Sequence, residues 1–532
     1  METMPASSPQ TVSRVRVSAG MLAMLIGAAA VLLHALVAVF TPYGIFRDEL
    51  YYIACSKRLA FGYVDHPPLS IVTLFVARNL LGDSMFAIRL VAALLSGLTT
   101  WLTGMIALRM GGSRFAVAIA CLAAMLTPIS IAMHSVYSMN ALDHFFWTLG
   151  AWLFLPLVEM TKEGEPSLET SVRQKYWWLL LGLLIGLGSM NKIGMLWFAA
   201  GIAVAVLFTP LRRQLRTPWP WVAAGIAVLL FLPYVLWNAA NDFAHLEFIR
   251  NATTMKYGGI SRLGFLRDLF LEVNPLYVPL FLIGLWYLFL HPKGKAFRAL
   301  GMVFLVAFAI LFLNGHSKAE YLSPTFPMIF AAAGVWLESV SQRRPSVLRP
   351  VLVVWVVAAG LLLLPFAAPV LPAAAFVKYT DLLGVSHPNS ESRNLDVLPQ
   401  FFADMHGWED FAKTISKVYL SLPEKERRDA VVFARNYGQA GAIEYYADRY
   451  PAPRVIAVHN NYWLWGYPEQ IGTVIVIGGE EKTHRASCDE AVEAAVFRSS
   501  YVMPYENNQT IWICRGLRRS IKVIWKEEKV YI

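Results

Sequence analysis

Eleven long apolar segments occupy most of the first 372 residues and constrain the fold more than any other feature. Most are close to the roughly 20 residues that an α-helix needs to cross a bilayer. A chain in lipid must satisfy its backbone hydrogen bonds internally, and helices do so within one segment. The sequence therefore predicts a polytopic α-helical membrane protein with about 11 spans. The segments lie at 19–40, 84–108, 115–134, 142–160, 177–190, 194–209, 219–238, 274–290, 299–315, 322–340 and 350–372.

The composition agrees with this prediction and excludes other classes of protein. The 532 residues are 57% hydrophobic and 15% charged, whereas soluble domains are about 25% charged. So few charges do not cover the surface of a soluble protein of this size. A cytosolic enzyme, a disordered chain and a fibrous repeat are therefore excluded.

Basic residues are distributed unevenly along the chain. Residues 1–372 carry 27 Lys and Arg against 16 Asp and Glu, whereas residues 373–532 carry 19 against 20. With a cytoplasmic N-terminus, every inner loop holds at least two basic residues, from Arg109 and Arg114 in the first to the cluster at 343–349 in the last. This pattern predicts a multi-pass protein of the cytoplasmic (inner) membrane with an exported C-terminus. The excess of basic residues is therefore better explained as a signal for membrane orientation than as a nucleic-acid-binding site.

Three segments are expected on the outer side of the membrane. Two are loops, 41–83 and 239–273, which join spans of the transmembrane domain 1–372. The third, 373–532, is expected to be a soluble exported α/β domain. Its short β-branched runs are typical of buried strands, and one helix is expected after the first of them. The strands are expected at 430–434, 454–458 and 473–477, and the helix at 438–450.

Cysteine spacing predicts one disulfide in the exported domain. Cys488 and Cys514 are 26 residues apart, and a disulfide persists outside the cytoplasm. Cys55 and Cys121 have no evident partners, and no spacing typical of a metal site occurs.

Two stretches of the first outer loop are candidates for chemistry. Asp48 and Glu49 follow the first span, where a carboxylate at the lipid boundary is a candidate general base; the alternative is a solvated pair of loop acids. Further on, prolines after Asp65 and His66 restrict the backbone. In one interpretation, the two side chains are held in fixed positions to bind phosphate or a divalent metal. In the other, the segment is a plain turn before an interfacial helix at 69–81.

Other candidates lie near the ends of later spans. Asp143 lies at the start of the fourth span. An ionisable group there suggests a functional role, or it is an acid favoured at the start of a helix by the helix dipole. Lys192, between spans five and six, is suited to bind a phosphate group. The alternative is that its long side chain extends to the membrane–water interface. Lys318 and Tyr321 precede the tenth span and offer a cation and a phenol, although both are also usual interfacial anchors.

Together, these motifs resemble the polytopic glycosyltransferases of the GT-C fold. The resemblance is greatest to bacterial members of the protein O-mannosyltransferase-like group, which includes the aminoarabinose transferases of lipid A, and it covers spans one to ten. Its most specific parts are Arg47-Asp48-Glu49-Leu50-Tyr51-Tyr52 and Asp65-His66-Pro67-Pro68-Leu69. Supporting parts are Asn191-Lys192-Ile193-Gly194 and Lys318-Ala319-Glu320-Tyr321-Leu322.

The resemblance implies a role for each candidate residue. Asp48 matches the catalytic base and Asp143 a second acid of the same cavity, while Asp65 matches an acid that holds a metal in some members. The substrate-binding residues would be Arg47, Glu49, His66, Lys192, Lys318 and Tyr321. His66 stands where some relatives have lysine, so its charge at neutral pH depends on its surroundings.

The activity implied is transfer of a sugar from a polyprenyl-phosphate donor to a cell-envelope acceptor, with inversion. The acceptor would be lipid A, a polysaccharide, a glycolipid or a protein; no cofactor is required, and a divalent metal is an option. The segments 436–442 and 460–466 also resemble the exported tail of bacterial members, and the aromatic residues of the second would stack on sugars or pack the domain. A secondary transporter or a membrane scaffold with an exported binding domain is the alternative.

Overall fold

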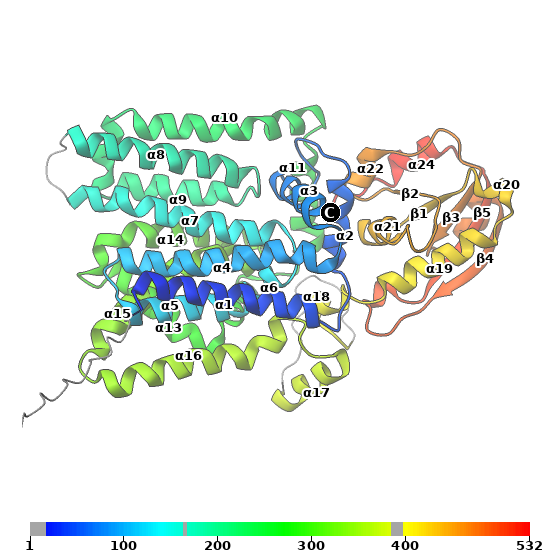
Figure 1. Cartoon of the computed structure of the whole chain (residues 1–532). Helices are drawn as coiled ribbons and strands as arrows, with labels where there is room; N and C mark the ends of the chain where they lie inside the picture. Colours follow the sequence, from blue (N-terminus) through cyan, green and yellow to red (C-terminus); the bar gives the residue numbers. More distant parts are fainter. Residues whose placement is uncertain (1–16, 163–167, 385–396) are drawn as a thin grey trace, which may run out of the picture.

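The computed structural model describes residues 17–162, 168–384 and 397–532, in which a helical bundle is followed by a unit built on a β-sheet (Figure 1). Each of the eleven predicted spans overlaps at least one helix. In the described part, six helices are each long and apolar enough to cross a bilayer. They are α1 (Ala19–Phe40), α4 (Met85–Arg109), α7 (Met139–Glu159), α10 (Trp219–Ala240), α14 with the turn before it (Gly294–Asn314) and α16 (Pro345–Ala367).

Three pairs of helices in the described chain pass the same test together but are bent at a break, as in a broken span or a re-entrant loop, and each break has the same cause. In each case the second helix starts at a proline, which lacks the N–H needed to continue a helix but suits the first position of a new one. The pairs are α5 (Arg114–Leu126) with α6 (Pro128–Ser135), α9 (Met195–Phe208) with the 3-10 helix Pro210–Arg216, and α12 (Arg262–Val273) with Pro275–Phe289, which contains α13 (Val278–Phe289). The remaining two predicted spans lie in α8 (Leu168–Ser189) and α15 (Phe326–Ser341).

The first outer segment is more helical than a loop. It contains α3 (Leu69–Leu81), as expected, but also α2 (Arg47–Ser56). The expectation that Asp48 and Glu49 lie in a loop is therefore wrong: both are in the first turn of α2. The Glu49 carboxylate accepts a hydrogen bond from the Phe46 N–H at 2.9 Å, which satisfies a donor at the helix start.

The second outer segment is also helical, with α11 (Ala244–Asn251) continuing into a π-turn (Ala252–Lys256) before α12. Figure 1 shows α2, α3 and α11 together at the end of the bundle that faces the sheet.

The sheet has five strands in the described chain, in the order β2-β1-β3-β5-β4. The predicted strands are present as β1 (Val431–Ala434), β2 (Arg454–Ala457) and β3 (Thr473–Ile477), which pair in parallel. Sequence analysis missed β4 (Cys488–Phe497) and β5 (Gln509–Leu517), which continue the sheet in antiparallel fashion. The outermost strand, β4, is largely exposed and carries acidic residues, as is common in edge strands, so it lacks the apolar run of a buried one.

The sheet unit packs closely on the bundle through α21 (Tyr437–Tyr445), the helix expected after β1. Two glycines of α21 allow this contact with α2. A Cβ atom on Gly438 would lie 2.5 Å from Cγ of Arg47, and one on Gly441 would lie 3.0 Å from the carbonyl carbon and Cβ of Leu50. Since Cβ atoms do not approach other atoms so closely, larger residues would force the helices apart.

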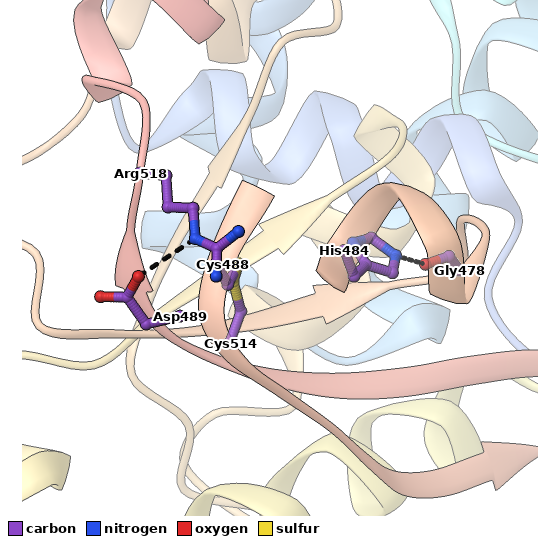
Figure 2. Close-up of a disulfide and its surroundings, with 6 residues drawn as sticks. All are labelled: Gly478, His484, Cys488, Asp489, Cys514 and Arg518. Atoms are coloured by element: carbon purple, nitrogen blue, oxygen red, sulfur yellow. Dashed lines mark hydrogen bonds and ion pairs between the residues drawn. A yellow bond between two sulfur atoms is a disulfide. The ribbon is translucent and has the colours of Figure 1, made fainter. Parts of the chain in front are cut away.

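Cys488 and Cys514 form a disulfide between β4 and β5, with their Cα atoms 5.8 Å apart (Figure 2). Beside it, Arg518 donates to Asp489 at 3.1 Å. The crosslink fastens the edge strand β4 to β5, and β3 separates these two strands from β1, the strand that precedes α21.

Candidate active site

A cavity of about 400 Å³ lies where the bundle meets the sheet unit. Its walls come from α2, the segment before α3, the turn between α8 and α9, the second outer segment, the turn before α15 and the start of α21. Most of the predicted site residues line it: Arg47, Asp48, Asp65, Lys192, Lys318 and Tyr321.

Asp48 is the most accessible of the three predicted aspartates. Its side chain is 37% exposed, against 17% for Asp65 and 4% for Asp143. One carboxylate oxygen, Oδ1, accepts a hydrogen bond from the Tyr437 hydroxyl at 2.9 Å and lies 3.6 Å from Nε of Arg47. A substrate in the cavity can therefore reach the carboxylate of Asp48.

Arg47 lines the cavity, but its guanidinium is directed to the sheet unit. It lies 3.5 Å from the Asp404 carboxylate and donates to the Tyr505 hydroxyl. Its central carbon, Cζ, lies above the Tyr437 ring, 5.3 Å from the ring centroid. These contacts fix the start of α2 against the sheet unit.

Glu49, expected to bind substrate, is not among the residues that line the cavity. It is fully buried beside Arg89 of α4. Its carboxylate accepts hydrogen bonds from Arg89 at 2.8 and 3.0 Å, from the Tyr137 N–H at 2.8 Å and from the Phe46 N–H. Neighbouring residues on a helix point roughly 100° apart, so only one of the two acids faces the cavity.

Asp65 lines the cavity, whereas His66 does not. The Asp65 carboxylate accepts a hydrogen bond from the Tyr51 hydroxyl at 2.9 Å. Burial raises the pKa of Asp65, opposed by His66 and by this hydrogen bond. The His66 ring is buried against Tyr52, with ring centroids 4.8 Å apart, so the expected phosphate contact by His66 is not supported.

The expected metal site on Asp65 is not accompanied by a cluster of protein ligands in the described chain. Among the described residues, no group of three or more His, Cys, Asp and Glu is placed to hold a metal ion. Two histidines that do line the cavity are His245 and His316, and His245 contacts the carbonyl oxygen of Val64 at 3.0 Å. Burial, with a contribution from His66, lowers the pKa of His245 to about 4, so this ring is neutral near pH 7.

Asp143 and Lys192 form an ion pair that the sequence did not reveal. Nζ of Lys192 lies 3.3 Å from the Asp143 carboxylate and donates to the Asn140 side chain at 2.7 Å. The next residue before it, Asn191, donates to the carbonyl oxygen of Met139 at 2.9 Å. The turn between α8 and α9 is thus tied to the start of α7, which aims the ammonium group of Lys192 into the cavity.

Lys318 and Tyr321 lie on the same side of the cavity as Lys192. Nζ of Lys192 is 4.8 Å from the centre of the Tyr321 ring, and the Tyr321 and Tyr257 hydroxyl groups are 3.3 Å apart. Nζ of Lys318 lies 5.4 Å from the centre of the Tyr257 ring. Cations from two separate turns therefore converge around a pair of phenols.

Sequence analysis missed several residues of the site. Lys256 and Tyr257 of the second outer segment and Tyr437 of α21 line the cavity. The sequence of 436–442 resembles the exported tail of bacterial family members, but nothing in it indicates a contact with α2. The neighbouring Tyr462 and Trp463, considered as sugar-stacking residues, instead pack inside the structure: Tyr462 is buried, and Trp463 donates to the carbonyl oxygen of Trp525 at 2.8 Å.

Comparison with known proteins agrees with the fold. Residues 65–237 match the family model described as dolichyl-phosphate-mannose-protein mannosyltransferase. This range includes Asp65, Asp143 and Lys192. A search of curated proteins found no match.

Several solved structures have a similar fold. ArnT from Cupriavidus metallidurans bound to undecaprenyl phosphate superposes with a TM-score of 0.60 at 13% identity, covering 92% of this chain and 97% of ArnT. Its apo state gives a TM-score of 0.59 at the same identity and coverage. The arabinofuranosyltransferase AftD from Mycobacteria gives 0.50 at 15% identity, covering 95% of this chain and 41% of AftD. The chain therefore has the GT-C fold of polytopic membrane glycosyltransferases.

Proposed function

We propose that this protein transfers a sugar from a polyprenyl-phosphate donor to a cell-envelope acceptor. The observation that carries the proposal is one cavity that holds an accessible carboxylate, Asp48, together with the cations Lys192 and Lys318. Two similarities support the choice of donor. The matching family model is described by a dolichyl-phosphate-linked mannose, and ArnT was solved with undecaprenyl phosphate.

The proposed reaction is a single displacement at the anomeric carbon of the donor sugar. The carboxylate of Asp48 takes the proton from the acceptor hydroxyl as its oxygen forms the new bond to that carbon. The bond between the carbon and the phosphate oxygen breaks, and both electrons leave with the lipid phosphate. Lys192 and Lys318 would stabilise the negative charge of that leaving group. Attack opposite to the leaving group inverts the anomeric configuration.

Asp143 suits a supporting role better than that of base. Its carboxylate is nearly buried and lies 3.3 Å from Nζ of Lys192. An acid that neutralises a buried lysine holds that lysine in place. We therefore assign Asp143 the positioning of Lys192, and Asp48 the proton transfer.

The proposed location is the outer face of the cytoplasmic membrane, with the domain 1–372 in the bilayer and residues 373–532 outside. Support comes from the basic residues of the inner loops and from the cavity's position on the sheet side of the bundle. Reporter fusions after Arg213 and after Lys378 should report opposite sides of the membrane. Fusions that report the same side would refute this topology.

The activity is tested with purified protein in liposomes, supplied with polyprenyl-phosphate-linked sugars and with lipid A, polysaccharide, glycolipid or protein acceptors. Release of the lipid phosphate with labelling of one acceptor is the expected result. Envelope analysis of a deletion strain should show the matching loss of that sugar. Solute transport by the same liposomes, without sugar transfer, would instead favour the secondary transporter.

A further inference from the structure

We infer that Tyr437, supplied by the sheet unit, is a positioning residue for Asp48. The inference rests on the proposed function and extends it: the part of the chain after the bundle completes the active site. It starts from the hydrogen bond of 2.9 Å between the Tyr437 hydroxyl and Oδ1 of Asp48.

The backbone of Tyr437 is held at the start of α21 by buried polar contacts. The preceding residue, Asn436, accepts a hydrogen bond from the Gln439 N–H at 3.0 Å and caps the helix. Both side chains donate to the carboxylate of Glu506, at 2.8 and 2.7 Å. Since capping contacts determine where a helix begins, this network fixes the position of Tyr437.

The ring of Tyr437 is held from several sides. Its centroid lies 4.7 Å from that of Tyr51 and 4.9 Å from that of His459, and the guanidinium of Arg47 lies 5.3 Å away. Only 8% of Tyr437 is exposed. The hydroxyl is therefore directed at Asp48 by packing.

The distance between the two residues is also set by the backbone. Gly438, next to Tyr437, and Gly441, one turn later, bring α21 close to α2: a Cβ atom at Gly438 would lie 2.5 Å from Cγ of Arg47, and one at Gly441 would lie 3.0 Å from Leu50. A larger separation of the helices would move the Tyr437 hydroxyl away from the carboxylate.

The hydrogen bond leaves Asp48 with one oxygen for catalysis. Oδ1 is occupied by the Tyr437 hydroxyl, whereas Oδ2 has no hydrogen-bond partner among the described residues. Burial raises the pKa of Tyr437 well above its ordinary value; Arg47 opposes this increase, and Asp48 adds to it. The phenol thus stays protonated and donates, and it orients the carboxylate so that Oδ2 meets the acceptor hydroxyl.

The test is Tyr437→Phe, which removes the hydroxyl and keeps the packed ring. We expect kcat for sugar transfer to fall about 10- to 100-fold, with the donor KM and Tm near those of the wild type. The matched control is Tyr462→Phe. Tyr462 lies in the same unit, is 2% exposed, and is not among the residues that line the cavity. The control should keep wild-type kcat.

A double-mutant cycle separates positioning from structure. If Tyr437 acts through Asp48, Tyr437→Phe should lower kcat in the wild type but have no further effect on Asp48→Asn. Equal losses in both backgrounds, or a Tyr437→Phe protein as active as Tyr462→Phe, would overturn the inference. Absence of transfer by the wild-type protein would instead overturn the proposed function itself.

Discussion

The two sides of the cavity differ in how they hold their charged groups. On one side, Lys192 and Lys318 reach in from turns between bundle helices, beside the rings of Tyr321 and Tyr257. On the other side, Asp48 lies on a helix that is fixed against the sheet unit and is hydrogen-bonded by Tyr437. Lys192 is held within the bundle by Asp143 and Asn140, whereas the Asp48 carboxylate is oriented from the sheet unit.

This difference matches the two tasks of the proposed reaction. Stabilising a departing phosphate requires positive charge nearby but tolerates some variation in distance. Taking a proton requires a carboxylate oxygen within about 3 Å of one hydroxyl group. The lysine side should therefore mainly affect donor binding, and the carboxylate side should mainly affect turnover.

The largest expected effect is on the carboxylate side. Asp48→Asn keeps the size and polarity of the side chain but removes the base, so turnover should fall about 10²–10⁴-fold with donor binding retained. The measurement is transfer from a polyprenyl-phosphate sugar in membranes, with the exposed-loop variant Asp83→Asn as control. Normal transfer by Asp48→Asn, together with an inactive Asp143→Asn, would identify Asp143 as the base.

The adjacent acid should affect stability more than turnover. Glu49→Gln leaves Arg89 buried without its charged partner, which typically costs about 3–5 kcal/mol. Thermal unfolding in detergent should show a clearly lower Tm, while Asp48→Asn should unfold like the wild type. A Glu49→Gln protein of normal stability but lost turnover would place Glu49 in the reaction.

The disulfide tests whether the edge of the sheet contributes to the site. Cys488→Ser should destabilise the sheet unit by about 3 kcal/mol, measured by denaturant unfolding of the full chain. Turnover of the folded fraction should be unchanged, because the disulfide joins β4 and β5, which β3 separates from β1, the strand that precedes α21. Two free thiols in protein from the native membrane would show that the bond does not form.

The smallest effect is expected on the lysine side. Lys192→Ala removes a charged contact to the donor phosphate worth about 1.5–3 kcal/mol, and should raise the donor KM by about 10- to 100-fold. Lys417→Ala, on an exposed face of the sheet unit, provides the control. If Lys192→Ala lowered kcat alone, the proposed division between the two sides of the cavity would be wrong.

The spans and most cavity residues could be predicted because each leaves a local signal. Apolar runs reveal the helices, and a charge at the end of a span, such as Lys192, is costly enough to suggest a purpose. The direction of a side chain has no such signal. Asp48 and Glu49 are neighbours of the same charge, and only their helical geometry and the distant Arg89 separate their roles.

Contacts across the fold explain the remaining errors. Lys192 has no acid near it in sequence, yet α7 brings Asp143 to it, so the lysine already has a partner before any phosphate arrives. His66 follows a cavity residue but turns into the aromatic core. Tyr437 belongs to a segment whose amide and glycine residues indicate only a capped helix, and its partner is visible only once the sheet unit is docked.

The contact between Tyr437 and Asp48 also affects when the active site is completed during synthesis of the chain. The two residues are 389 positions apart in the chain, and ribosomes add about 5–20 residues per second, so roughly 20–80 s separate their synthesis. During that interval the bundle can insert and meet lipid while its carboxylate lacks the tyrosine that orients it. A newly made protein thus becomes fully active only after its last part has folded, and truncated chains left in the membrane would do little chemistry.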